Sequence, residues 1–228
     1  MISIIIPVCN EAAYLSSLLP YLKEDAGMLL AEVIVVDGGS DDNSKEVCAH
    51  NNVLFIEALV SNRSMQMNRG AQIARGSILY FVHADTRPPK QFALQIMEAY
   101  NKGSQMGRFR TVFDSTSWLL KLNAYFTKFD WFMCYGGDQT LFVETKVFKK
   151  INGFKETLCI MEDYDITQRL KATGTYTILN DLVKVSARKY EKNSWLAVQR
   201  ANYKAVKAYK NNIDTTIIKE QYLSRLKK

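Results

Sequence analysis

Short apolar runs recur along the first 85 residues, and polar side chains follow each run. The runs cover residues 2–8, 32–36, 53–57 and 78–82. Their many β-branched and aromatic residues are typical of strands buried on both faces of a parallel sheet. Helical segments are expected between the runs, at residues 12–23, after Asn43 or Ser44, and at residues 63–75. The alternation predicts an α/β fold with a doubly wound parallel sheet and right-handed crossovers.

The residues that follow these strands can form a binding pocket. They are Asn10-Glu11, Asp37, Ser61-Asn62-Arg63 and His83-Ala84-Asp85. Ligands of open α/β sheets bind outside the carboxyl ends of the strands, so these side chains are expected to meet. Acidic groups suit a base or ribose, and Arg63 suits a diphosphate. Taken singly, Asp37 could belong to an ordinary loop and Arg63 could be a surface charge.

His83 and Asp85 form the most specific of these pairs. Both are metal ligands, and a turn at the strand end can bring both onto one ion. The carboxylate suits Mg²⁺ or Mn²⁺ carrying a diphosphate. The alternative is structural, with Asp85 or Thr86 capping the helix that follows Pro88-Pro89.

The second half of the chain has a different pattern. Residues 89–101 predict a helix, and residues 108–113 alternate like a half-exposed strand. An aromatic set then recurs at spacings of four and three, which predicts one amphipathic helix: Trp118, Leu122, Tyr125, Phe129 and Phe132. Core packing is the default meaning of that face. Neighbouring lysines make contact with an anionic membrane the alternative.

Further elements are expected towards the C-terminus. Strands are predicted at residues 140–143, 176–179 and 183–186, and a helix from Glu162 to about Thr173. Glu162 and Asp163 open that helix, where its dipole favours carboxylates and where acidic residues commonly cap. Asp138, after two glycines, is typical of a turn. A last helix carries a basic stripe of Arg200, Lys204 and Lys207.

Composition excludes several classes of protein. The chain has 228 residues, 47% hydrophobic and 23% charged, which is ordinary for a soluble globular protein. Its four cysteines form no CxxC pair, so a reducing, cytoplasmic location is expected. Neither a signal peptide nor a membrane-spanning run is recognisable. The GxGxxG and Walker motifs are absent, which argues against dinucleotide oxidoreductases and P-loop enzymes.

The net charge of +7 indicates anionic partners. Nucleotides and phospholipid head groups both fit. No nucleic-acid-binding motif accompanies the charge, so nucleic acid is not an expected partner.

These motifs, in this order, resemble glycosyltransferase family 2. The resemblance rests on residues 3–11, residues 33–40, Arg63 with Asn68-Arg69-Gly70, the triplet His83-Ala84-Asp85, and Glu162-Asp163, and runs from Ile2 to about Arg188. Further details are similar to a bacterial subgroup of radical-SAM/selenodomain-associated transferases, some assigned to arsenosugar biosynthesis. They are Gln66-Met67-Asn68, residues 81–86, Gly137-Asp138-Gln139, Met161-Glu162-Asp163 and Ser186-Ala187-Arg188.

The resemblance implies a GT-A fold, with a Rossmann-like, mostly parallel sheet and a smaller mixed region. A single domain would comprise a nucleotide-binding half (1–86), an acceptor and catalytic half (87–190) and a basic helical region (191–228). The implied activity is inverting transfer of a sugar from a nucleotide-diphosphate sugar to an unidentified hydroxyl. The Gln-x-x-Arg-Trp element of processive members is missing, so polymer synthesis is not expected.

Two other functions compete with sugar transfer. Histidine at position 83, where the family has aspartate, motivates a catalytically inactive nucleotide-sugar-binding or scaffold module. A nucleotidyltransferase would need a glycine-rich loop with Arg and Lys after the first strand, which residues 7–11 do not provide.

The resemblance also implies roles at matching positions. The nucleotide-sugar set is Pro7, Asn10, Glu11, Asp37, Arg63, Asn68, His83, Ala84 and Asp85. Asp85 would bind the metal with His83, whose imidazole suits Mn²⁺ better than Mg²⁺. Asp163 would be the general base, with Glu162 and Asp138 as further catalytic candidates.

Overall fold

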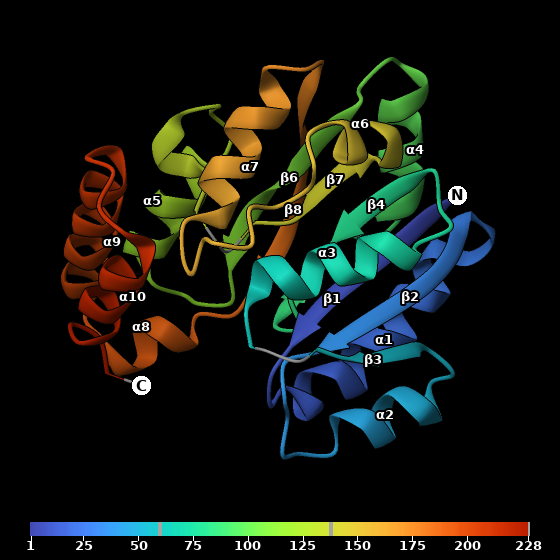
Figure 1. Cartoon of the computed structure of the whole chain (residues 1–228), viewed down its shortest axis with the longest axis horizontal. Helices are drawn as coiled ribbons and strands as arrows, with labels where there is room; N and C mark the ends of the chain where they lie inside the picture. The colour runs from blue at the N-terminus through green and yellow to red at the C-terminus, as the bar shows by residue number, and fades with distance from the viewer. Residues whose placement is uncertain (59–60, 137–138, 228) are drawn as a thin grey trace.

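The computed structural model describes residues 1–58, 61–136 and 139–227, and its centre is a mixed sheet (Figure 1). The strand order is β3-β2-β1-β4-β7-β6-β8-β5. The strands are β1 (Ile2–Val8), β2 (Leu30–Asp37), β3 (Leu54–Glu57), β4 (Ile78–Phe81), β5 (Thr86–Arg87), β6 (Met106–Phe113), β7 (Leu141–Glu144) and β8 (Tyr176–Val185). The first four are parallel to one another, whereas β7 runs antiparallel to β4 and β6. The predicted α/β order of the first 85 residues is therefore confirmed.

Helices cover both faces of this sheet. One face carries α1 (Ala12–Ala26), α2 (Ser44–His50) and α4 (Phe92–Asn101); the other carries α3 (Arg63–Ile73), α6 (Thr145–Lys150) and α7 (Glu162–Lys171). Strand β1 separates the two cores, because Ile4 and Ile6 pack on the first face and Ile5 on the second. Successive side chains of a strand point to opposite faces of the sheet, and both faces are buried here, so every residue of the strand is under pressure to be apolar.

Helix α3 packs unusually close to the sheet. A Cβ atom on Gly70 would lie 2.6 Å from Cγ2 of Ile5, so only glycine fits there without a shift. Near the start of the helix, Nε2 of buried Gln66 donates to the carbonyls of Val8 (2.8 Å) and Val36 (2.7 Å), where β1 and β2 end. The amide thereby fixes Arg63, the first residue of α3, beside the ends of these strands.

The pairing of β5 with β8 joins distant parts of the chain. Thr86 pairs with Val185, and the carbonyl of Asp85 accepts a hydrogen bond from the amide of Ser186 (3.2 Å). The predicted capping role of Asp85 or Thr86 is wrong, because α4 begins only at Phe92. The amides of Gln91 and Phe92 instead donate to the carboxylate of Asp25 (2.9 and 3.2 Å).

The aromatic segment does not form one helix, contrary to the sequence prediction. Helix α5 (Trp118–Phe126) ends early, and a short 3₁₀ turn, η2, follows at Phe132–Cys134. Arg108 explains this break, because its guanidinium donates to the carbonyls of Thr127 (2.8 Å) and Phe129 (3.1 Å). A buried cation thus takes carbonyls that a continued helix would use for its own bonds.

Strand β6 also differs from its prediction as a half-exposed strand. Arg108 is 2% exposed, and most of β6 is buried. The two short strands expected near residues 176–179 and 183–186 are one strand, β8. Its register slips, so that Phe109 pairs with Leu179 while Arg110 pairs with Leu182. The polar residues Asn180 and Asp181 lie in this slip, between the two predicted segments.

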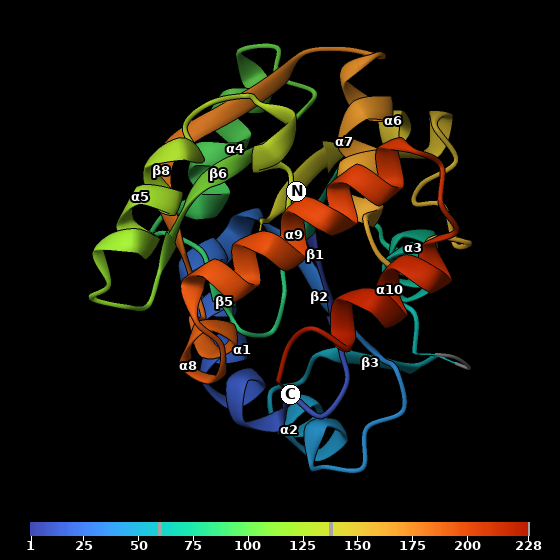
Figure 2. The same cartoon turned by 90° about the vertical axis from the view of Figure 1, so that its left-hand side faces the viewer.

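Three helices lie within the described residues 188–227, where one was predicted. They are α8 (Arg188–Lys192), α9 (Trp195–Lys210) and α10 (Thr215–Leu223). They lie beyond the carboxyl ends of β1 and β2 (Figures 1 and 2). A third apolar cluster connects α9 and α10 to the start of α7, through Met161, Tyr164, Ala205, Val206 and Ile218. Among the helices of the described residues, none combines the length and hydropathy needed to span a bilayer.

Candidate active site

A cavity of about 550 Å³ opens at the carboxyl ends of β1 and β4. Strand ends and the start of α3 form one side, and the start of α7 with helices α8 to α10 forms the other. The sequence-predicted residues that line it are Pro7, Glu11, Arg63, His83, Ala84, Asp85, Glu162 and Asp163. Its volume lies within the range typical of small-molecule sites.

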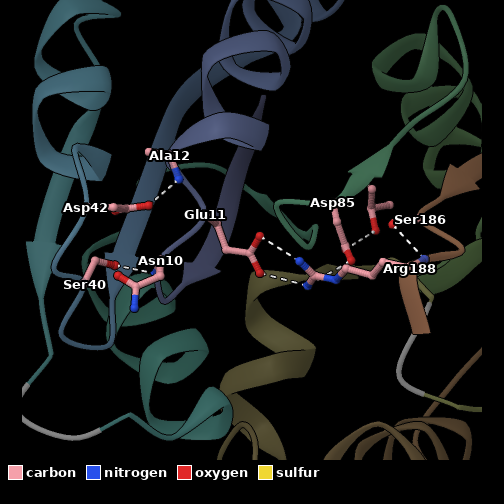
Figure 3. Close-up of polar contacts among 9 residues, drawn as sticks. Asn10, Glu11, Ala12, Ser40, Asp42, Asp85, Ser186 and Arg188 are labelled. Carbon is pink, nitrogen blue, oxygen red and sulfur yellow. Dashed lines mark hydrogen bonds and ion pairs between the residues drawn. The ribbon is translucent and has the colours of Figure 1, made fainter. Parts of the chain in front are cut away.

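Arg188 lies between the two acidic side chains of the strand ends (Figure 3). Its Nη2 is 2.8 Å from Oε1 of Glu11 and 3.2 Å from Oδ2 of Asp85, and its Nη1 is 3.1 Å from Oε2 of Glu11. The hydrogen bonds that Arg188 donates to Glu11 raise the pKa of the Arg188 guanidinium further above its ordinary value. The site therefore holds a permanent positive charge where two β-strands end.

Sequence reasoning did not select Arg188 as a site residue. The triplet Ser186-Ala187-Arg188 follows a predicted strand and carries part of the family resemblance, so a signal was present. Its partners could not be read from the sequence, because only the pairing of β5 with β8 brings residue 188 to residue 85.

His83 is neutral at pH 7. Its burial, followed by the positive charges of Arg63 and Arg188, lowers the pKa of its imidazole to about 3. A neutral imidazole has a nitrogen lone pair for a metal. His83 and Asp85 both line the cavity, so the nitrogen and carboxylate donors predicted for Mn²⁺ border the same space.

The donor set fits a metal that shares its coordination with a ligand. Across residues 1–58, 61–136 and 139–227, no three His, Cys, Asp or Glu side chains gather as a complete protein site. Two protein donors suit Mg²⁺ or Mn²⁺ bound through substrate phosphates, because such ions commonly take one or two carboxylates and phosphate oxygens.

Helix α7 presents two acids to the cavity in different ways. Oε1 of Glu162 is 3.6 Å from Nη1 of Arg63, and the Glu162 side chain is only 8% exposed. Asp163 is half-buried and therefore more accessible from the cavity. Both lie inside the first turn, since the N-cap residue is Met161, whose backbone is left-handed at φ 72°. Nearby Asp165 is paired with Lys155 and Arg169.

Three predicted residues lie outside the cavity lining. The side chain of Asn10 accepts a hydrogen bond from the Asp41 amide (2.8 Å). Asp37 is buried and accepts bonds from the amides of Gly39 and Ser40 (3.0 and 2.9 Å), which holds its own turn. Asn68 donates to the carbonyl of Phe154 (2.9 Å). Their binding roles stay predictions. Asp138 lies outside the described residues.

Comparison with known proteins identifies the family. The family model described as "Glycosyl transferase family 2" matches residues 3–154. No curated protein sequence matches the chain. The structure is similar to that of S. aureus TarS, with 17% identity and a TM-score of 0.66 over 98% of this chain and 71% of that one.

Two other solved structures share the fold. One is the mannosyltransferase PcManGT from Pyrobaculum calidifontis in complex with GDP-Man and Mn²⁺, at 15% identity and a TM-score of 0.69, over 92% of this chain and 64% of that one. The other is glucosyl-3-phosphoglycerate synthase from Mycobacterium tuberculosis, at 15% identity and a TM-score of 0.59, over 99% and 80%. Identities this low establish the fold alone, and that fold is the predicted GT-A architecture.

Proposed function

This chain belongs to glycosyl transferase family 2, and from that membership we propose that it transfers a sugar from a nucleotide-diphosphate sugar to an acceptor hydroxyl. The observation that carries the proposal is one cavity lined by His83, Asp85, Asp163 and Arg188. His83 and Asp85 offer donor atoms for a metal. Asp163 is a candidate base, and Arg188 is a cation that can bind phosphate. The complex of PcManGT with GDP-Man and Mn²⁺ supports the same class of donor and ion.

The strand-end side of the cavity would bind the diphosphate. Arg63 carries positive charge on this side, and Arg188 reaches it from α8 on the other side. A guanidinium matches phosphate oxygens with two parallel hydrogen bonds. His83 and Asp85 would hold Mn²⁺ or Mg²⁺, which neutralises charge on a departing diphosphate. Pro7 and Glu11 lie on the same side, where the nucleoside is expected.

The start of α7 would supply the base. Asp163 would accept the proton of the acceptor hydroxyl while the oxygen of that hydroxyl bonds to the anomeric carbon of the sugar. The bond from that carbon to the diphosphate breaks on the opposite face, and the diphosphate leaves with the bonding electron pair. A single displacement of this kind inverts the anomeric configuration. Glu162, which is paired with Arg63, is the second candidate for the general base.

A nucleotide-sugar-binding module without turnover is the alternative. Histidine at position 83 motivates it, because the family resemblance places aspartate there. Both functions require donor binding, so binding alone does not separate them. Release of nucleoside diphosphate from the donor, above the rate in a protein-free sample, separates them.

The test begins with a thermal-shift screen of nucleoside diphosphates, with and without Mn²⁺. The stabilising nucleotide then selects the sugar donors for a turnover assay that measures nucleoside diphosphate release. Asp163→Asn should retain the thermal shift and lose turnover. Asp181→Asn, which alters an exposed carboxylate bonded to Gln95 and outside the cavity lining, is the matched control. Nucleotide binding without turnover by the unmodified chain, with every donor and acceptor tried, would favour the binding module.

We also propose that helices α5 and α9 contact an anionic membrane surface. Trp118, Leu122 and Tyr125 follow one another at helical spacing on α5 and are 70%, 41% and 51% exposed. Lys128 lies against the ring of Tyr125, with its Nζ 3.6 Å from the ring centroid. Exposed aromatic groups beside lysines suit the boundary between lipid head groups and acyl chains.

Helix α9 repeats this arrangement with more charge. Leu196 and Tyr203 are 50% and 59% exposed, and the predicted basic residues Arg200, Lys204 and Lys207 are also exposed. The indole Nε1 of Trp195 on α9 donates to Asn123 of α5 (3.3 Å), so the two helices are in contact. Lipid head groups provide the negative charge that this basic and aromatic surface matches.

A further inference from the structure

We propose that Arg188 competes with the divalent cation for Asp85, so that the cation binds well only together with a diphosphate. This inference concerns the donor site of the function proposed above and rests on it. It assigns Arg188, which was not among the site residues predicted from the sequence, a role in the binding of both the cation and the diphosphate. The observation behind it is the guanidinium shared between Glu11 and Asp85 (Figure 3).

The two carboxylates hold Arg188 unequally. Glu11 makes two contacts, at 2.8 and 3.1 Å, whereas Asp85 makes one longer contact at 3.2 Å. Arg188 can therefore leave Asp85 and remain bonded to Glu11. The side chain of Arg188 is 47% exposed and that of Asp85 is 22% exposed, so solvent weakens the pairing and permits exchange.

The backbone on both sides of this contact is fixed. Thr86 pairs with Val185, and the amide of Arg188 donates to Oγ of Ser186 (3.2 Å) at the start of α8. The distance between the two chain segments is thus set by the sheet. Exchange at Asp85 requires a change of side-chain torsions in Arg188 and no displacement of a strand.

The charge of Arg188 determines which ligands it opposes and which it favours. A divalent ion on Asp85 would replace the guanidinium and experience repulsion from it at close range. A diphosphate reverses this balance, because its oxygens accept hydrogen bonds from the displaced guanidinium and its charge attracts both cations. Arg188 therefore opposes binding of the ion alone and favours binding of the ion with a diphosphate.

The experiment measures two affinities, each in the absence of sugar transfer. The first is for Mn²⁺ alone, followed by loss of the free-ion electron paramagnetic resonance signal. The second is for the preformed complex of Mn²⁺ with inorganic pyrophosphate, followed by calorimetry. Arg188→Gln should bind Mn²⁺ alone about tenfold more tightly than the unmodified chain, and the pyrophosphate complex about tenfold more weakly. A general disturbance of the site would move both affinities in the same direction.

Three variants complete the design. Arg188→Lys keeps the charge and should bind Mn²⁺ alone as weakly as the unmodified chain. Arg75→Gln removes a guanidinium that pairs with Glu32 (2.8 Å) away from the cavity lining, and should change neither affinity. Combining Asp85→Ala with Arg188→Gln should abolish the gain in Mn²⁺ affinity, because the contested ligand is gone.

Unchanged or weaker binding of Mn²⁺ alone by folded Arg188→Gln overturns the proposal, and melting curves establish that the variant is folded. A tighter affinity that Arg188→Lys shares equally also overturns it, since charge would then not be the cause. Failure of sugar transfer gives a different result. The proposed function would fall, whereas both affinities for pyrophosphate and Mn²⁺ would still report on Arg188.

Discussion

The two sides of the cavity were built in different ways. On the strand-end side, Glu11, His83 and Asp85 directly follow parallel strands, so chain order alone places them at one edge of the sheet. On the opposite side, Arg188 depends on a two-residue strand, and Asp163 on a left-handed turn at Met161. Local patterns thus predict the first side and the acids of α7, whereas the position of Arg188 needs a pairing between residues far apart in sequence.

The comparison also separates two chemical tasks. The strand-end side gathers groups suited to phosphate and metal, and the start of α7 presents carboxylates suited to proton transfer. If the division is correct, substitutions on one side should alter binding and those on the other should alter turnover.

The largest effect is expected from Asp163→Asn. The amide is nearly isosteric but cannot accept the acceptor's proton, so transfer should fall by roughly two to four powers of ten. Donor affinity should stay close to that of the unmodified chain. Turnover with a competent acceptor, donor affinity and melting temperature are measured together. Near-normal turnover with a lowered melting point would refute the catalytic role and transfer attention to Glu162.

Asp85→Ala should reduce binding on the strand-end side. Loss of a carboxylate ligand should weaken metal-dependent binding of nucleoside diphosphate by roughly 100-fold, with the fold intact. Calorimetric titration with and without Mn²⁺ measures the loss. The companion variant His83→Asp should retain binding and shift preference from Mn²⁺ towards Mg²⁺. Unchanged metal preference would show that His83 does not bind the ion.

Gly70→Ala tests how closely α3, the helix that carries Arg63, packs on β1. The new Cβ would lie 2.6 Å from Cγ2 of Ile5, so α3 must move or the side chain must adjust. Overpacking of this kind typically costs about 1–3 kcal/mol of stability. Denaturant unfolding measures the change, with Gln72→Ala on the exposed face of the same helix as control. Equal stability of the two variants would contradict the close packing of α3 on β1.

Membrane contact should give the smallest effect. Binding to anionic liposomes should weaken as salt rises, because ions screen attraction between the lysines and lipid head groups. Trp118→Ser should reduce flotation several-fold at low salt through loss of apolar contact. Neutral liposomes and Met28→Ser, which alters an exposed residue in the 3₁₀ turn η1 (Gly27–Leu29), are the controls. Absence of flotation with anionic liposomes at low salt would rule out this membrane contact.

The sequence supported much of the fold because the first strands are continuous apolar runs with polar ends. It misled where a side chain at one position controls the backbone at another. Arg108 has the polarity of an exposed strand residue, yet it is buried and ends α5 by binding carbonyls about twenty residues later. Likewise, Asn180-Asp181 suggested a break in a strand, although β8 continues past it with a change of register.

The same limit applies to the candidate site. Asp37 and Asn10 were selected because they follow strands, and both side chains bond to the loop of residues 37–41. Position after a strand predicts proximity to the cavity but does not predict which way a side chain turns. Arg188 shows the converse, since an ordinary basic residue at the start of a short helix becomes the bridge between two predicted acids.

The pairing of β5 with β8 limits how the two parts of the chain could be recombined with those of a relative. The family match ends at residue 154, whereas Asp163, Arg188 and helices α8 to α10 follow it. These later segments meet the strand-end side through this pairing and through the ion pair of Arg188 with Glu11. A chimaera that keeps residues 1–154 and takes the remainder from another member of the family should therefore keep its donor site only if the new part supplies a strand that pairs with Thr86 and an arginine that reaches Glu11.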